Sequence, residues 1–319
     1  MQYMTVDGLP PVSKVGLGTM RFGEKDFDPQ LARALVRRAL ELGINCFDTA
    51  EAYGWGRGER LLGQALAAEE ATDALITSKY APLLPLPAVI ERHAGASRTR
   101  LGVKQIPLYL LHAPNPLFPR RLIMRGFGRA QETGVIGAAG VSNHSLSQWQ
   151  AAEAALGHPV VANQVLFNLL HRGPLDDLVP WAARHQRLII TASPLGQGML
   201  TGRYDQDHLP AGLPWPRRLA LRHSALPPTP ANLRRLAPLL EQLRGIADRH
   251  GAAPAAIALA WVISHDPVVV IPGASTISQL EANAAAADIT LTPDEQQTLA
   301  AAASQARPQR DKATAGVRA

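Results

Sequence analysis

Four side chains with acid–base chemistry lie at or just after the ends of apolar runs. Asp48 and Tyr53 fall within "INCFDTAEAYGWG" (44–56). Lys79 ends "ALITSK" (74–79), and His112 ends "IPLYLLH" (106–112). A buried strand gains nothing from an unpaired carboxylate at its end, because burying such a charge is costly. The ends of these runs therefore lie either in solvent or at a functional site.

Together these residue types could protonate a carbonyl oxygen while a hydride arrives at its carbon. A tyrosine has a pKa of about 10, which is too high for an efficient acid at neutral pH. One ammonium at about 4 Å supplies about 4 kcal/mol at an effective dielectric of about 20, enough to lower that pKa by about 3 units. Lys79 is the candidate for this charge, and Asp48 would keep Lys79 protonated. His112 would hydrogen-bond the substrate oxygen or help to relay a proton.

Each residue also has a purely structural interpretation. Asp48 could cap the following turn, and Tyr53 could be a packed loop aromatic. Lys79 could be a solvated strand end, and His112 could be a core histidine with its hydrogen bonds satisfied. Four such residues at consecutive strand ends favour a shared site over four unrelated roles.

Eight short apolar runs, continuous rather than alternating, are typical of strands buried on both faces. They span 15–20, 44–49, 74–79, 106–112, 135–142, 160–165, 188–193 and 268–273. Helix-like segments separate most of them, such as 28–43, which opens with Asp-Pro and ends at Gly43. Regular strand–helix alternation predicts a parallel sheet, and eight repeats predict a closed (β/α)₈ TIM barrel. A doubly wound open sheet is the alternative.

The strand ends carry the polar residues that a barrel enzyme needs, because the chemistry of such barrels lies at the carboxyl ends of the strands. At least six of the eight runs end on polar or ionisable residues: Thr19, Asp48, Lys79, His112, Ser142 with Asn143, Gln164 and Ser193.

Residues 1–306 are expected to form a single domain. A long Pro-rich loop covers 201–230, after the seventh strand, and loops of this length are usually functional or disordered. The polar, basic tail 307–319 shows no periodicity and is expected to be disordered.

Composition limits the possible partners. The chain has 319 residues, a net charge of +6 and a pI near 9.8, but its basic residues are scattered, which argues against nucleic acid. The single cysteine, Cys46, fits a reducing compartment. The amino-terminal residues lack signal-peptide features, and no apolar stretch approaches membrane-spanning length, so a cytoplasmic protein without membrane contact is expected. The histidines form no metal-binding motif, and no metal is expected.

The order and spacing of several motifs resemble the aldo-keto reductase family of NADP(H)-dependent oxidoreductases over nearly the whole chain. These motifs are "GLGTMRFG", "FDTAEAYGWGRGERLLGQAL", "ITSKY", "LYLLHAPNP", "GVSNHS", "NQVLFNLLHR", "SPLGQGMLTGRY" and "IPGASTISQLEANAAAAD". The resemblance implies that Tyr53 is the general acid/base and that Asp48, Lys79 and His112 complete a catalytic tetrad.

The resemblance also implies the cofactor contacts. Ser142, Asn143 and Gln164 match residues that hold the nicotinamide carboxamide. Ser193, Leu195 and Gly198 match the segment that cradles the pyrophosphate. The adenosine-phosphate segment is matched by Gly273, Ala274, Ser275, Gln279 and Asn283. Thr19 and Met20 end the first strand at the same site. The loop 201–230 resembles one that folds over the cofactor, with Arg203 and either Arg217 or Arg218 available to meet phosphate.

Two departures from the family pattern concern the cofactor. Ala192 stands where many members have an aromatic that stacks on the nicotinamide, a role open to Phe167 or Trp215. The adenosine segment lacks the Lys or Arg that many members use for the 2′-phosphate, as in the branch that includes the potassium-channel β subunits. NADP(H) is the expected cofactor, with NAD(H) less excluded than usual.

The predicted substrate pocket is apolar and favours an apolar or aromatic aldehyde or ketone. Its candidate residues are Met20, Phe22, Trp55, Tyr80, Pro114 and Trp215. The predicted activity is that of a carbonyl reductase or alcohol dehydrogenase. The alternatives are an NADP(H)-binding regulatory or sensor subunit with weak catalysis, and a Schiff-base aldolase that uses Lys79.

Overall fold

The computed structural model describes residues 1–205 and 229–306. Most of the long loop 201–230 falls outside these ranges, together with Trp215, Arg217, Arg218 and the tail 307–319. The predictions made for those residues therefore remain predictions.

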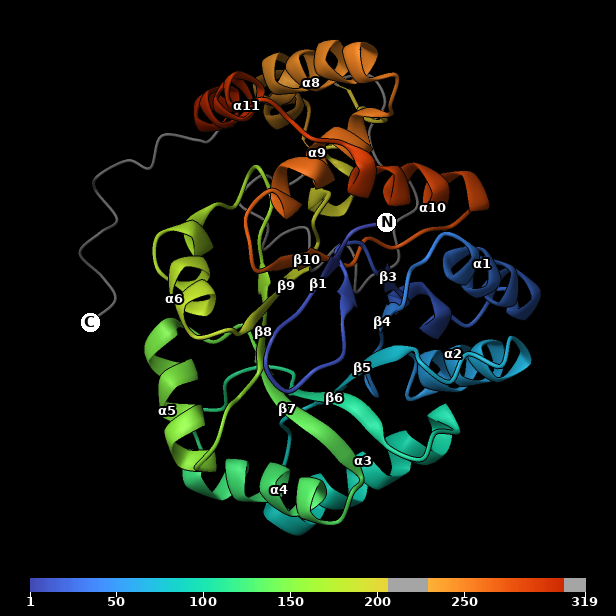
Figure 1. Ribbon diagram of the computed structural model, residues 1–319, viewed down its shortest axis with the longest axis vertical. Coiled ribbons are helices and arrows are strands. Elements are labelled where there is room, and N and C mark those ends of the chain that lie inside the picture. Colours follow the sequence, from blue (N-terminus) through green and yellow to red (C-terminus); the bar gives the residue numbers. More distant parts are fainter. Residues whose placement is uncertain (206–228, 307–319) are drawn as a thin grey trace.

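Eight parallel strands form the centre of the fold, in the consecutive order β10-β9-β8-β7-β6-β5-β4-β3 (Figure 1). They are β3 (Leu17–Gly18), β4 (Cys46–Asp48), β5 (Leu75–Tyr80), β6 (Ile106–Leu111), β7 (Ile136–Ser142), β8 (Ala162–Leu166), β9 (Leu188–Ala192) and β10 (Val268–Val270). Parallel bridges join Val15 to Val270 and Gly18 to Gly273, so the first and last strands of the sheet meet. The predicted (β/α)₈ barrel is confirmed, and the open-sheet alternative is wrong.

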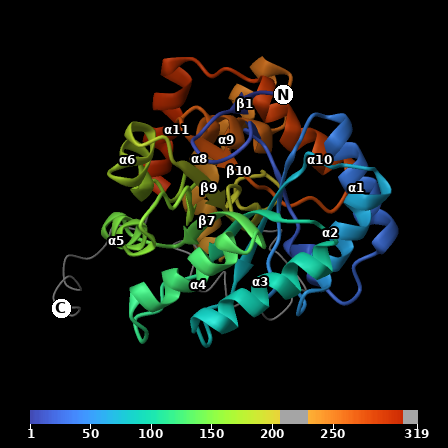
Figure 2. The same cartoon turned by 60° about the horizontal axis from the view of Figure 1, so that its bottom comes forward.

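Helices surround the strands, as the two views in Figures 1 and 2 show. They are α1 (Pro29–Glu41), α2 (Arg57–Ala68), α3 (Pro87–Leu101), α4 (Arg120–Glu132), α5 (Leu146–Leu156), α6 (Leu178–Arg184), α8 (Pro230–His250), α9 (Pro254–Ile263), α10 (Ile277–Ala284) and α11 (Pro293–Ala306). Asp28 caps α1 by accepting a hydrogen bond from the Gln30 backbone, and Ser145 forms a capping box with Gln148 at α5. Neither α3 nor α11 was predicted from the sequence.

A short antiparallel hairpin, β1 (Tyr3–Met4) and β2 (Val12–Ser13), precedes the barrel and was also not predicted. Its Met4 and Val12 belong to the same buried apolar cluster as Leu75 and Leu108 from the strands. The hairpin therefore packs across the amino end of the barrel.

The barrel interior changes character along its axis. Its apolar cluster includes Cys46, Leu75 and Leu188 near the amino ends of the strands, whereas a second, larger core fills the space between strands and helices. Near the carboxyl ends the buried residues are instead polar, and among them are Asp48 and Lys79. This arrangement concentrates charge at one end of an otherwise apolar cylinder.

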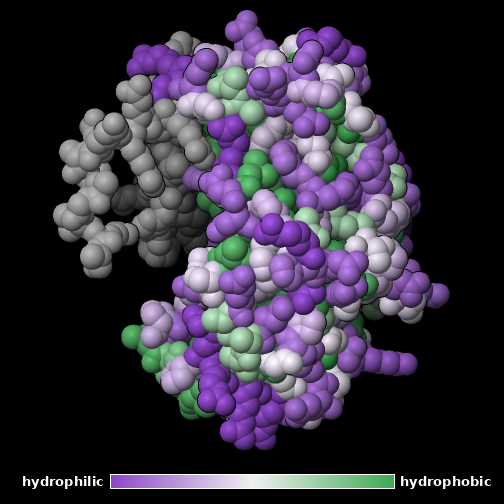
Figure 3. All heavy atoms as spheres, turned by 60° about the vertical axis from the view of Figure 1, so that its left-hand side comes forward, coloured by the Kyte–Doolittle hydropathy of each residue, from purple (hydrophilic) through white to green (hydrophobic). Residues whose placement is uncertain are grey.

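Across the described residues, no helix is both long enough and apolar enough to cross a bilayer. On the face shown in Figure 3, hydrophobic residues appear as small patches separated by hydrophilic ones.

Candidate active site

A buried lysine lies at the centre of the polar cluster. Lys79 Nζ donates to Asp48 Oδ2 at 2.7 Å, to the backbone oxygen of Thr49 at 2.7 Å and to Tyr53 Oη at 3.2 Å. Lys79 is 0% exposed and Asp48 is 3% exposed. The three acceptors match the three N–H donors of an ammonium, so the buried charge is fully hydrogen-bonded.

The sheet register and one tight turn bring these groups together. Asp48 pairs with Thr77 across β4 and β5, and Lys79 lies two residues further along β5. After β4 the chain turns at Ala50–Tyr53, where the Tyr53 N–H donates to the Ala50 oxygen at 3.0 Å, and Tyr53 Oη meets Lys79 Nζ. The next residue, Gly54, has a φ of +60° and its backbone lies against Gly23, so the path of the chain beside Tyr53 depends on a left-handed residue without a Cβ.

Electrostatics keep Lys79 charged. Burial favours its neutral form, but the nearby Asp48 carboxylate and Tyr53 outweigh burial and raise the pKa of Lys79 above its usual value. Asp48 is held in turn by Gln164, whose Nε2 donates to Asp48 Oδ1 at 2.7 Å.

The expected lowering of the tyrosine pKa is not found. Burial raises the pKa of Tyr53, and although the Lys79 charge opposes this, the pKa remains above its usual value. The physical reason is that the phenolate would lose hydration, and one ammonium shared with Asp48 does not fully replace it. Tyr53 is therefore a protonated phenol at neutral pH.

His112 lies edge-on to Tyr53, with the ring centroids 6.0 Å apart and the planes at 77°. Burial and the charge of Lys79 lower the pKa of His112 to about 4. The imidazole is therefore neutral at neutral pH. Of the two roles predicted for it, this state favours a hydrogen bond to a substrate oxygen over proton relay through an imidazolium.

The predicted nicotinamide residues lie beside Asp48. Ser142 Oγ donates to the backbone oxygen of Gln164 at 3.0 Å, and Asn143 Nδ2 donates to Ser142 Oγ at 3.1 Å. Gln164 reaches Asp48, as described above, and Thr19 Oγ1 donates to the Asp48 backbone oxygen at 2.8 Å. Amide and hydroxyl groups thus adjoin the tetrad, and this donor set fits a carboxamide.

The predicted pyrophosphate segment follows β9. Ser193, Gly196, Gln197 and Gly198 all have φ between +50° and +98°, and Leu195 precedes the short 3₁₀ turn Gly196–Gly198. A run of left-handed residues exposes backbone N–H groups in a way that suits an anion.

Strand β9 ends on Ala192, so its last residue offers no aromatic ring that could stack on a nicotinamide. Phe167, one of the two candidates for this role, is enclosed in the core. Its side chain is fully buried and packs edge-on against Trp261 at 6.1 Å between ring centroids. Trp215 lies outside the described residues.

The predicted adenosine segment joins β10 to α10. The Ser275 backbone donates to Gln279 Oε1 at 2.8 Å, and Asn283 Nδ2 donates to the Gly273 oxygen at 3.4 Å. Ala274, in the same segment, is buried. Arg203 is exposed, and its guanidinium lies 5.8 Å from the Tyr204 ring centroid.

One cation at this segment was not predicted from the sequence. The Arg21 guanidinium, from the 3₁₀ turn η1 (Met20–Gly23), hydrogen-bonds Ser275 Oγ. The predicted fold could have indicated this contact, because the first and last strands of a closed barrel are neighbours. Residues that follow β3 must therefore lie beside residues that follow β10.

The predicted pocket residues divide into two groups. Met20 and Trp55 are 54% and 87% exposed at the mouth, and Pro114 is half-buried. Phe22 and Tyr80 are each 1% exposed. Phe22 packs on Phe27, and Tyr80 packs on His93 of α3 and donates to the Leu84 oxygen. Neither side chain therefore presents exposed surface at the mouth, and their role in the substrate pocket remains a prediction.

Other apolar side chains lie on the mouth loops. Leu83 and Leu117, which follow β5 and β6, are 81% and 85% exposed. The two loops are joined, since Asn115 Nδ2 donates to the Pro82 oxygen at 2.8 Å.

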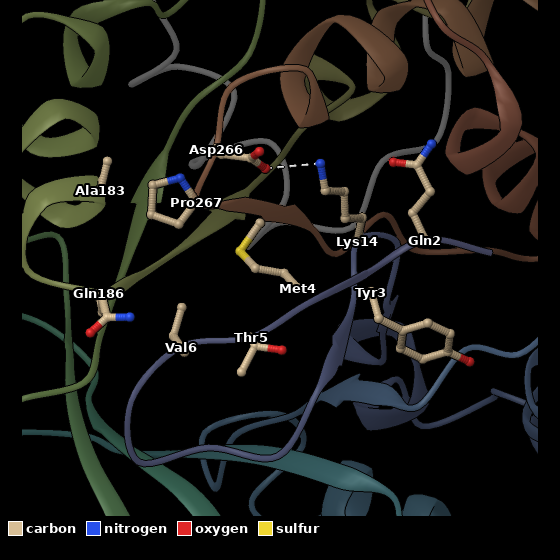
Figure 4. Close-up of a pocket in the computed structure, with 10 residues that line it drawn as sticks. All are labelled: Gln2, Tyr3, Met4, Thr5, Val6, Lys14, Ala183, Gln186, Asp266 and Pro267. Atoms are coloured by element: carbon tan, nitrogen blue, oxygen red, sulfur yellow. Dashed lines mark ion pairs between the residues drawn. The ribbon is translucent and has the colours of Figure 1, made fainter.

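A hollow of about 610 Å³ lies at the opposite, amino end of the strands (Figure 4). Residues 2–6 line it together with Lys14, Ala183, Gln186, Asp266 and Pro267. Lys14 and Asp266 form an ion pair of 2.9 Å there. It is separate from the tetrad. Within the described ranges, no group of three or more His, Cys, Asp or Glu side chains could hold a metal ion.

The closed parallel barrel with its polar cluster at the carboxyl ends defines a protein of the (β/α)₈ class. The profile of the aldo/keto reductase family matches residues 14–304, so the chain belongs to this family of oxidoreductases.

Similar proteins agree with this assignment. An uncharacterized oxidoreductase of Mycobacterium tuberculosis is 47% identical over 316 residues, which cover 97% of this chain and 94% of the relative. The chloroplastic pyridoxal reductase of Arabidopsis thaliana is 32% identical, over 92% of this chain and 83% of the relative. The crystal structure of an aldo/keto reductase from Klebsiella pneumoniae with NADP and acetate superposes with a TM-score of 0.73 and 30% identity, over 94% of each chain.

Proposed function

We propose that this protein transfers hydride between NADP(H) and the carbonyl carbon of an aldehyde or ketone, with Tyr53 as general acid/base. The observation that carries the proposal is the position of Lys79 Nζ, which bonds both Asp48 and Tyr53 Oη. Bound NADPH would supply the hydride.

Each residue of the tetrad has one task in this proposal. Tyr53, protonated at neutral pH, donates its proton to the carbonyl oxygen. The Lys79 ammonium at 3.2 Å stabilises the phenolate that forms, and Asp48 keeps Lys79 charged. Neutral His112 donates a hydrogen bond to the same substrate oxygen. In alcohol oxidation the proton moves in the reverse direction.

The residues present fit the cofactor. Ser142, Asn143 and Gln164 would orient the carboxamide beside Asp48, and the left-handed backbone at Gly196 and Gly198 would admit the pyrophosphate. The segment from Gly273 to Asn283 would hold the adenosine half.

An apolar or aromatic small-molecule carbonyl compound is the proposed substrate. Met20 and Trp55 support this, because large exposed apolar side chains at a pocket mouth gain most by covering apolar ligand surface. The single cysteine supports a reducing, cytoplasmic location.

Steady-state turnover of an aldehyde panel with NADPH tests the proposal. We expect turnover in the wild type and its loss in Tyr53→Phe. NADPH binding without turnover on any carbonyl would reject the reductase in favour of a sensor subunit. Borohydride trapping of a substrate on Lys79 would instead favour a Schiff-base aldolase.

A further inference from the structure

We propose that Arg21 recognises the 2′-phosphate that distinguishes NADP(H) from NAD(H). This inference rests on the proposed function, because it requires the adenosine half of the cofactor to lie on the Gly273–Asn283 segment. That segment carries no Lys or Arg of its own. The structure supplies a cation to it from an element 254 residues away in sequence.

Barrel closure places Arg21 there. Gly18 forms a bridge with Gly273, and its N–H donates to the Pro272 oxygen at 3.1 Å. A Cβ on Gly18 would lie 2.6 Å from the Ile271 oxygen, so the strands approach at a distance that only glycine permits. The 3₁₀ turn that follows β3 then presents Arg21 directly to Ser275.

The guanidinium is held in one orientation. Arg21 Nε bonds both oxygens of Glu24, at 3.3 and 3.2 Å, and Nη2 bonds Glu24 Oε2 at 3.1 Å. The Phe27 ring centroid lies 5.7 Å from the guanidinium carbon. One edge of the planar group is thus occupied by Glu24, while Nη1 faces Ser275. A guanidinium fixed in this way loses little entropy when it binds a phosphate.

The remaining groups suit a phosphate monoester. Ser275 Oγ and the Gln279 side chain adjoin the Arg21 contact, and both can donate hydrogen bonds. The nearby Glu281 carboxylate is paired with Arg38 at 2.8 Å. Since Glu24 already shares the Arg21 charge, we expect discrimination at the lower end of the range for one charge-assisted contact, about tenfold.

The test compares ligands with and without the 2′-phosphate. Dissociation constants are measured by protein fluorescence for NADPH and NADH, and by calorimetry for adenosine 2′,5′-bisphosphate and adenosine 5′-monophosphate. Arg21→Met should weaken the two 2′-phosphorylated ligands about tenfold or more and the other two less than about twofold. Arg21→Lys keeps the charge but loses the planar guanidinium. Its affinity for the 2′-phosphorylated ligands should therefore lie between those of the wild type and Arg21→Met. Arg33→Met is the matched arginine control, because Arg33 pairs with Glu69 outside the site, and it should show no such selectivity. Arg203→Ala tests the loop arginine that the family resemblance also makes available to phosphate.

Three outcomes would overturn the inference. Equal loss for both cofactors in Arg21→Met would place the arginine at the shared pyrophosphate or in the fold. Selective loss in Arg203→Ala alone would assign the 2′-phosphate to the other arginine. Equal wild-type affinity for NADPH and NADH would show that the protein does not recognise the 2′-phosphate at all. Absence of carbonyl turnover, with Arg21-dependent binding intact, would reject the reductase and still support the inference.

Discussion

Lys79 Nζ lies 2.7 Å from Asp48 Oδ2 and 3.2 Å from Tyr53 Oη, so one buried ammonium links a carboxylate to a phenol. Asp48 influences Tyr53 through Lys79. Asp48 raises the pKa of Lys79 and keeps it charged, and the charge on Lys79 then favours the phenolate of Tyr53. Because burial still leaves the pKa of Tyr53 raised, the phenol is a proton donor whose conjugate base is stabilised only when it forms.

Tyr53→Phe should lower turnover by at least about 100-fold, the usual scale for a positioned acid. NADPH affinity should change little, because phenylalanine keeps the ring that lies 4.9 Å from Lys79 Nζ. Tyr80→Phe removes a hydroxyl that faces Leu84 instead of the mouth, and it should retain turnover. Equal effects of the two substitutions would remove Tyr53 from the mechanism.

Asp48→Asn should act through its neighbour. Lys79 loses its counter-charge, its pKa falls, and the phenolate of Tyr53 is less stabilised. We expect reduced turnover at neutral pH and a displaced pH–rate profile, with Lys79→Met inactive as the reference. If Asp48→Asn kept the wild-type profile while Lys79→Met was inactive, the supporting role of Asp48 would be wrong.

His112 should make stability depend on pH. Burial lowers its pKa from 6.5 to about 4, so between these values the unfolded chain binds a proton that the folded chain does not. The stabilisation is complete above pH 6.5 and is lost as pH falls through about 4, by up to about 3 kcal/mol.

Urea unfolding at several pH values measures this loss. Burial also lowers the pKa of His144 and His265, so the wild type alone does not isolate one residue. The difference in the pH dependence of unfolding free energy between the wild type and His112→Gln isolates the contribution of His112. An unchanged slope in His112→Gln would show that His112 does not titrate as described.

Gly54→Ala should disturb the turn that carries Tyr53. Its φ is +60°, and an added Cβ would overlap the Gly23 backbone, so both strain and collision are expected. Gly102→Ala is the matched control, because its φ is +69° but a Cβ there would meet nothing within 4 Å. The control should lose about 1 kcal/mol of unfolding free energy. Gly54→Ala should lose more and also lose turnover, as thermal melts and rate assays would show.

Local patterns in the sequence determined the barrel and most of the tetrad. Continuous apolar runs mark strands buried on both faces, and a polar residue at the end of each run has few explanations other than solvent or a site. These patterns are sufficient to place Asp48 and Lys79 at one shared site. The α3 helix was not predicted, because its apolar residues follow no clear helical period and its sequence contains Gly95, a residue with low helix propensity.

Tertiary structure alone decided which neighbours share charge and which side chains face the mouth. Phe22 and Tyr80 have the composition of pocket residues, yet both pack into the layer behind the strands. The pKa of Tyr53 depends on the balance between burial, which raises it, and the charge of Lys79, which lowers it. Residue types alone do not determine this balance. Arg21 reaches Ser275 only because the sheet closes on itself. Sequence patterns are local, whereas desolvation and barrel closure depend on residues hundreds of positions apart.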